Sequence, residues 1–213
     1  LGSGAVPLLA GGNCSHIVGM IGGLQRTYGA TARIGLLWLD AHGDFNTPAT
    51  SLSGMYGGMP VAVAAGLCLP DWREGGGQLV PLPADRIVMV DVRNLDEPEE
   101  QLIRSTDVEI ARFGREFDPG PVLDAIDRLV SEVDQLYVHV DADILDESLQ
   151  PNHPTAEPGG PDVQAVISVL ERAMTSGKLA AFALVSVNAS GEGSETSLAS
   201  GADVLVGAMG FAT

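Results

Sequence analysis

Two short segments of the sequence place acidic side chains and a histidine two residues apart. Asp40, His42 and Asp44 follow one apolar run, and Asp141 and Asp143 follow another. In extended backbone, residues two apart point to the same side, so the side chains within each segment are expected to converge. Carboxylates and imidazole together are good ligands for a divalent metal, and burying this many acids without a cation would be prohibitively costly. We therefore interpret the two segments as halves of one two-metal hydrolase site.

Each segment taken alone also has an ordinary structural explanation. Acidic residues after a strand often cap a helix or a loop, and the histidine would then be incidental to a turn. Both segments directly follow an apolar strand, however, and chance seldom places two such acidic segments after strands of one sheet. The pair of segments therefore favours metal binding over capping.

The remaining sequence supplies the elements that would position these residues. Continuously apolar strands are predicted at 6–10, 34–39, 87–92, 108–111, 136–141 and 180–187. Helices are predicted at about 17–28, 60–67, 99–105, 122–133, 163–174 and 198–209. The segment 69–85, which holds several prolines and three consecutive glycines, is predicted to be a loop. Alternating helices and continuously apolar strands predict a three-layer α/β/α fold with a mostly parallel central sheet, and functional residues in such folds gather at the carboxyl ends of strands.

Length and composition limit the classes of function. At 213 residues the chain fits a single domain over residues 1–213, and its apolar fraction of 45% suits a globular protein. A net charge of −17 argues against a nucleic-acid or an anionic-membrane partner. Cys14 and Cys68 are too few for a disulfide framework, and no apolar run reaches membrane-spanning length. We therefore expect a cytoplasmic protein.

Three stretches of the sequence resemble the ureohydrolases, the family of arginase, agmatinase, formimidoylglutamase and relatives. Residues 40–48, Asp-Ala-His-Gly-Asp-Phe-Asn-Thr-Pro, are similar to the first metal signature of this family. Residues 141–146, Asp-Ala-Asp-Ile-Leu-Asp, followed by Pro-Gly-Gly at 158–160, are similar to the second. Gly-Gly-Asn-Cys-Ser at 11–15 lies where the family carries Gly-Gly-Asp-His-Ser. The resemblance runs from about residue 6 to about residue 190.

This resemblance implies an arginase-like fold and a centre of two Mn²⁺ ions. Asp40 and Asp141 would bridge both ions, and a hydroxide held between the ions would attack the planar carbon of a guanidino group. Asp44 and Asp141 would orient that hydroxide, and urea or hydroxyurea would leave together with an amine. The implied metal ligands are Asp40, His42, Asp44, Asp141 and Asp143, and Cys14 lies at the position of a sixth ligand.

The resemblance also assigns residues to the substrate. Asn46 and Ser53 match loop residues that grip the amino-acid end of the substrate in arginase, and Asp96 matches another such position. Thr155 matches a threonine that lies over the guanidino group. Asparagine and serine in turns mostly serve the turn itself, so each of these residues also has a purely structural explanation.

Three positions depart from the family pattern. Cys14 replaces a histidine ligand, and a thiol would weaken a manganese site or change its metal preference, whereas a buried lone cysteine equally suits a small apolar role. His16 is not expected to replace that ligand, because it would face elsewhere. Gly57 falls where the family has a proton-shuttling histidine. Ser186 falls where the family has a glutamate that pairs with the guanidinium, and a hydroxyl cannot hold this cation as a carboxylate does.

The details of these motifs are most similar to the hydroxyarginine amidinohydrolase branch associated with D-cycloserine biosynthesis, although Ser186 departs from this branch too. The leading hypothesis is a manganese-dependent amidinohydrolase acting on a small N-hydroxyguanidino or guanidino compound. The alternatives are a conventional arginase or agmatinase, and a ureohydrolase-fold protein that retains partial metal binding without turnover. The family normally carries further strands and helices before the position of Val6, so those units are expected to be missing here. Homo-oligomers are common in the family, and one is possible for this chain.

Overall fold

Six parallel strands form one continuous sheet in the computed structural model, which describes residues 5–211. The strands are β1 (Leu8–Ala10), β2 (Ile34–Leu39), β3 (Ile87–Val90), β4 (Glu109–Ala111), β5 (Gln135–Asp141) and β6 (Leu179–Val185). Their order across the sheet is β1-β6-β5-β2-β3-β4, and every neighbouring pair is parallel.

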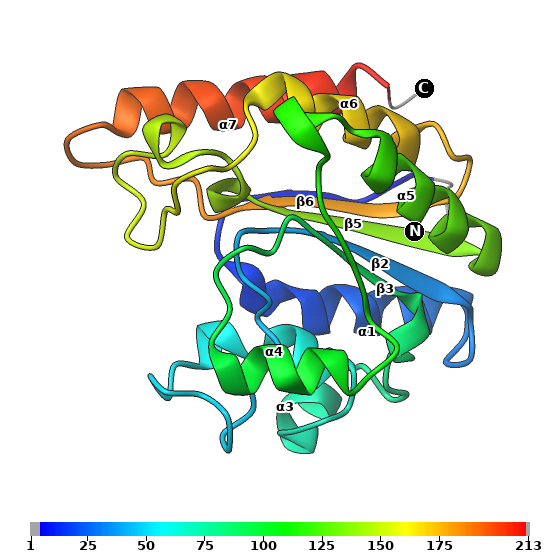
Figure 1. Cartoon of the computed structure of the whole chain (residues 1–213). Coiled ribbons are helices and arrows are strands. Elements are labelled where there is room, and N and C mark those ends of the chain that lie inside the picture. Colours follow the sequence, from blue (N-terminus) through cyan, green and yellow to red (C-terminus); the bar gives the residue numbers. More distant parts are fainter. Residues whose placement is uncertain (1–4, 212–213) are drawn as a thin grey trace.

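Helices cover both faces of this sheet (Figure 1). They are α1 (Ile17–Tyr28), α2 (Pro60–Ala64), α3 (Pro70–Gly75), α4 (Glu97–Arg104), α5 (Gly120–Glu132), α6 (Val163–Met174) and α7 (Ser194–Met209). Figure 1 shows α1, α3 and α4 on one face and α5, α6 and α7 on the other. Alternate residues of the central strands serve the two layers, so Trp38 packs toward α1 while Leu37 packs toward α5 and α6. The predicted three-layer α/β/α fold with a parallel sheet is confirmed.

The direction of winding reverses at the centre of the sheet. From β2 the chain adds β3 and β4 toward one edge, and it then returns to place β5 on the other side of β2, with β6 beyond it. In open parallel sheets, ligands bind outside the carboxyl ends of the strands at such a reversal. The carboxyl ends of the neighbouring strands β2 and β5 are therefore the position at which this fold favours a ligand site.

The predicted elements differ from the observed ones mainly in the segment 69–85. The prediction of a loop there is wrong, because α3 begins with Pro70 in its first turn and a 3₁₀ turn spans Ala84–Arg86. Proline is well tolerated at the start of a helix, where its missing N–H would have no partner. The last helix begins at Ser194, four residues before the predicted start, since its first turn is polar and carries no apolar signal. No helix among the described residues is long and apolar enough to span a membrane.

Candidate metal centre

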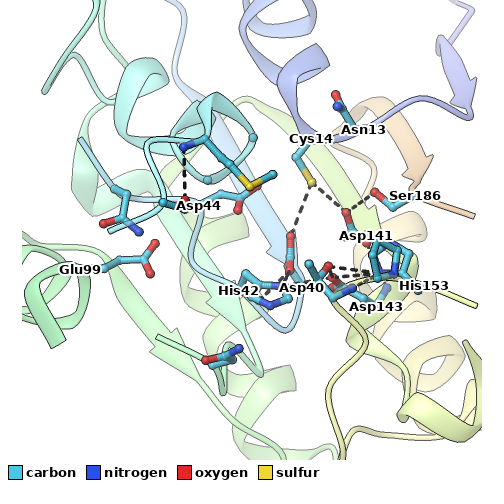
Figure 2. A pocket seen from close by; sticks show the side chains of 18 of the residues that line it. Asn13, Cys14, Asp40, His42, Asp44, Glu99, Asp141, Asp143, His153 and Ser186 are labelled. Atoms are coloured by element: carbon cyan, nitrogen blue, oxygen red, sulfur yellow. Dashed lines mark hydrogen bonds and ion pairs between the residues drawn. The ribbon is translucent and has the colours of Figure 1, made fainter. Parts of the chain in front are cut away.

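The centre of the site is a pair of buried aspartates at the carboxyl ends of β2 and β5. The register of the two strands pairs Leu39 with Val140, so Asp40 and Asp141 follow side by side. Both carboxylates are buried, at 1% and 4% relative exposure. Figure 2 shows them facing the same cavity, with Cys14 approaching from the turn before α1.

Tight turns bring three further residues to this pair. The backbone N–H of His42 donates to Asp40 Oδ1 (2.6 Å), and the N–H of Asp143 donates to Asp141 Oδ1 (3.0 Å). Asp44 has a positive φ of 47°, and its carbonyl accepts the N–H of Val61 at the start of α2. The expectation of a simple extended alternation is therefore wrong beyond the strand ends, because the side chains converge through turns.

Two groups of three candidate ligands share Asp40. Within each group, the ligand atoms lie within 4.8 Å of one another. The first comprises Cys14, Asp40 and Asp44, and the second comprises Asp40, His42 and Asp143. Asp141 lies beside both groups, since the Cys14 thiol donates to Asp141 Oδ2 at 2.9 Å and Asp143 follows on the same turn. His42 Nδ1 lies 3.1 Å from Asp143 Oδ2, which links the two sequence segments directly. All six predicted ligands therefore surround one centre, and metal binding by them stays a prediction.

The electrostatics of this cluster call for a cation. Burial raises the pKa of Asp40 and Asp44 well above the usual range, and burial together with the charge of Asp143 raises the pKa of Asp141 to about 7. Burial opposes protonation of His42, but hydrogen bonds with Asp143 and Asp40 outweigh it and raise its pKa to about 11. Ionising all four buried carboxyl groups beside a single imidazolium is therefore unfavourable, and a bound cation would remove this penalty.

The donor set fits manganese at all positions but one. Carboxylate oxygens and an imidazole nitrogen are ligands that Mn²⁺ prefers, whereas the Cys14 sulfur suits softer ions. Burial and the neighbouring Asp141 raise the pKa of the Cys14 thiol well above its usual value, so the thiol keeps its proton without a metal. The half of the centre that includes Cys14 is therefore expected to hold Mn²⁺ more weakly.

A cavity of about 380 Å³ opens above the cluster and holds all four predicted substrate residues in its wall. Asn46 is buried, and its side-chain oxygen has no hydrogen-bond partner. Ser53 has a turn role as well, because its hydroxyl accepts the N–H of Met55. The hydroxyl of Thr155 donates to Asp143 Oδ2 at 3.1 Å, which places it next to the metal cluster, and Asp96 lines the wall near the start of α4.

Comparison with known proteins identifies the family. A family model described as the arginase family matches residues 1–210. The chain belongs to the arginase family. It is 34% identical over 163 residues to an arginase of Bacillus caldovelox, a match that covers 74% of this chain and 52% of that protein. The chain thus spans about half the length of this curated relative.

Solved arginase structures share the fold. The arginase of Bacillus cereus is 26% identical with a TM-score of 0.84, over 100% of this chain and 72% of that one. The arginase of Entamoeba histolytica, solved in complex with L-ornithine, is also 26% identical, with a TM-score of 0.85 over 96% of this chain and 69% of that one. These matches confirm the predicted ureohydrolase membership and the predicted fold.

Two departures from the arginase family pattern face the cavity. Ser186, which follows β6 with a positive φ of 64°, donates its hydroxyl to Asp141 Oδ2 at 2.5 Å. Its side chain is therefore engaged with one of the candidate metal ligands. Gly57 lies in the 3₁₀ turn Tyr56–Gly58, and a Cβ added to it would meet no heavy atom within 4 Å. The space for a larger side chain at position 57 is therefore open.

The sequence analysis did not single out His153 and Glu157, which both lie on the long loop after β5. His153 Nδ1 is 3.8 Å from Asp143 Oδ2, and Glu157 Oε1 is 3.7 Å from His42 Nε2. The loop has no periodic pattern, so the only available signal was a histidine and an acid between the second metal motif and the Pro-Gly-Gly at 158–160. The two residues extend the polar environment of the cluster.

Arg93, at the end of β3, anchors this loop. Its guanidinium donates to Asp91 Oδ2 and also to five backbone carbonyls, those of Asp143, Ile144, Leu145, Glu157 and Pro158. A Cβ added to Gly160 would lie 2.5 Å from Arg93 Nη2, so glycine is needed there for the close approach. Both ends of the loop that carries His153 and Glu157 are thus fixed to β3.

Proposed function

We propose that this chain is a manganese-dependent amidinohydrolase that cleaves a C–N bond of a guanidino or N-hydroxyguanidino compound. The observation that carries the proposal is the pair of three-residue groups that share Asp40 at the base of one cavity. The cavity lies at the carboxyl ends of the neighbouring strands β2 and β5, as expected for a ligand site in this fold. The residues proposed to hold the ions are Asp40, His42, Asp44, Asp141, Asp143 and Cys14.

Two Mn²⁺ ions, when bound, supply an activated water at neutral pH and stabilise negative charge that develops on the substrate. The protein's own contribution is orientation. Asp141 is held by the Cys14 thiol and the Ser186 hydroxyl on one oxygen and by the Asp143 N–H on the other. Asp44 is fixed through its carbonyl to α2. We propose that these two carboxylates orient the attacking water against the guanidino carbon.

The outer part of the cavity suits the amino-acid end of a linear substrate. Asp96 offers a carboxylate to an ammonium group, and the unpartnered oxygen of Asn46 needs a donor. Ser53 offers a hydroxyl, and Thr155 lies between this region and the metal cluster. The L-ornithine in the Entamoeba histolytica arginase supports a substrate with such an end.

The inner part of the cavity favours a substituted guanidine over arginine. Ser186 donates to Asp141 and offers no carboxylate to a guanidinium, and Gly57 has no group that transfers a proton. A hydroxylated guanidine is less basic than arginine, so it depends less on both. We therefore place N-hydroxyguanidino acids ahead of arginine or agmatine as substrates.

The test is hydrolysis of a panel of guanidino and N-hydroxyguanidino compounds by the Mn²⁺-loaded chain, with amine and urea or hydroxyurea measured separately. Two ions per chain and turnover of the N-hydroxy compounds would support the proposal. Turnover of arginine or agmatine alone would favour a conventional arginase or agmatinase. One ion or none, without turnover, would favour a ureohydrolase-fold protein that has lost activity. Asp141→Asn is the matched inactive control.

A further inference from the structure

His153 lies at the edge of the metal cluster and is almost fully covered by protein. Its side chain is 8% exposed, and it forms a third group of ligand atoms within 4.8 Å, together with Asp141 and Asp143. Figure 2 shows His153 beside these two carboxylates. The imidazole is therefore within the range at which one ion could contact all three side chains.

The tautomer of His153 suits metal binding through Nδ1. The backbone N–H of Thr155 donates to Nδ1 at 3.3 Å, which keeps the lone pair on Nδ1 and the proton on Nε2. Nδ1 is also the atom that faces Asp143 Oδ2, at 3.8 Å.

The backbone around His153 is fixed in place. Its N–H donates to the Gln150 carbonyl, and the side chain of the neighbouring Asn152 donates to the carbonyls of Asn188 and Ser190 after β6. A ligand on a rigid segment loses little entropy when an ion binds. His153 therefore has the position of a ligand and also the support that a ligand needs.

The other three histidines of the chain either have partners away from the cluster or already belong to a group of candidate ligands. His139 is buried in the sheet, stacked on Trp38, with Nδ1 paired to the Tyr137 hydroxyl. His16 Nδ1 lies against the Asn13 carbonyl, and His42 belongs to the second three-residue group. Of the four histidines, only His42 and His153 have a ring nitrogen in a group of candidate ligands.

We propose that His153 is a metal ligand and supplies the second imidazole of the centre through Nδ1. This inference rests on the proposed function, because it requires that the cluster binds Mn²⁺. Thr155 keeps its hydroxyl bond to Asp143 when His153 binds the ion, and it gives up only the two long contacts to Nδ1, of 3.2 and 3.3 Å. The ligand set then contains two imidazole nitrogens, which are ligands that suit Mn²⁺.

The experiment counts imidazoles on bound Mn²⁺ in the full chain. Metal-free protein is titrated with Mn²⁺ by calorimetry, and pulsed EPR records the ¹⁴N couplings of the bound ions. We expect couplings from two imidazoles in the unchanged protein and from one in His153→Gln. We also expect that His153→Gln raises the Kd of one ion at least about tenfold. His16→Gln, which removes an imidazole outside the candidate groups, should change neither quantity.

The outcomes separate this inference from the proposed function. If the unchanged protein shows coupling from one imidazole, and only His42→Gln removes it, His153 is not a ligand while the metal centre stands. If His153→Gln keeps both couplings and the original Kd, the inference is equally overturned. If the unchanged protein binds no Mn²⁺, the proposed function itself fails. The coupling count in the unchanged protein needs no variant, so a folding defect in His153→Gln would not hide the answer.

Discussion

The metal-free protein should lose stability as the pH rises from about 4 to about 7. Asp141 has an unfolded pKa near 3.8, and burial with the charge of Asp143 raises its folded pKa to about 7. Between these values the unfolded chain has released a proton that the folded chain still holds, so the unfolded state is favoured progressively with pH. Over the whole interval between the two pKa values, this difference corresponds to about 4 kcal/mol of the free energy of unfolding.

His42 extends the same trend to higher pH. Its pKa is raised from about 6.5 to about 11 in the folded protein, so the stability it contributes is fully present below pH 6.5 and is lost toward pH 11. Bound Mn²⁺ supplies the missing positive charge and should therefore offset part of both losses. At a free Mn²⁺ concentration of 100 times Kd, binding adds about 2.7 kcal/mol.

The assay is urea unfolding of chelator-treated protein at pH 5, 6, 7 and 8, with and without Mn²⁺, for the unchanged chain and for Asp141→Asn. Asparagine carries no charge at any pH and keeps an oxygen that accepts from Cys14 and Ser186, whereas its NH₂ group loses the bond from the Asp143 N–H. The metal-free variant should therefore be more stable than the unchanged chain at pH 8, by up to about 4 kcal/mol. A free energy of unfolding that is constant or rises from pH 5 to 7 in the unchanged metal-free protein would refute this reasoning.

Substitutions at three further residues test single parts of the centre. Cys14→His should tighten the weaker Mn²⁺ site about tenfold, because imidazole suits this ion better than a thiol, and unchanged stoichiometry and affinity would count against Cys14 as a ligand. The structure has room for a side chain at position 57. Gly57→His should therefore raise the rate of arginine hydrolysis at least about tenfold, because the imidazole can act as a general acid or base. A folded, active variant with no gain in this rate would contradict the prediction. Glu157→Ala should weaken Mn²⁺ binding about tenfold, because Glu157 faces Nε2 of His42 and orients its ring. Glu157→Gln, which keeps an oxygen at this position, should retain most of the affinity for Mn²⁺. Equal affinities in the two variants would argue against an orienting role of Glu157.

The sequence predicts the sheet and the convergence of the acidic side chains well because both depend on local patterns. Continuous apolar runs indicate buried parallel strands, and the acids that follow these runs must lie at one edge of the sheet. Asp40 and Asp141 are adjacent for this reason alone. The short helix α3 was missed because its signals, a proline and three glycines, also indicate a loop.

Local sequence patterns do not specify the irregular backbone that brings some residues to the cluster. Asp44 reaches the cluster through a left-handed turn, and Ser186 reaches Asp141 from a similar conformation after β6. The position of His153 depends on the path of a long loop, which no periodicity specifies. The family resemblance indicated where Ser186 departs from the pattern, but the hydrogen bond that it makes instead required coordinates.

The way in which Arg93 anchors the loop after β5 leaves the sequence of that loop unusually free to change. Within the loop the guanidinium contacts only main-chain oxygens, and every residue type provides the same oxygen. Substitutions at the middle of the loop therefore alter what faces the cavity without loosening the attachment. The side chains that this loop presents to the cavity can thus be exchanged one at a time, provided that Arg93 and Gly160 are kept.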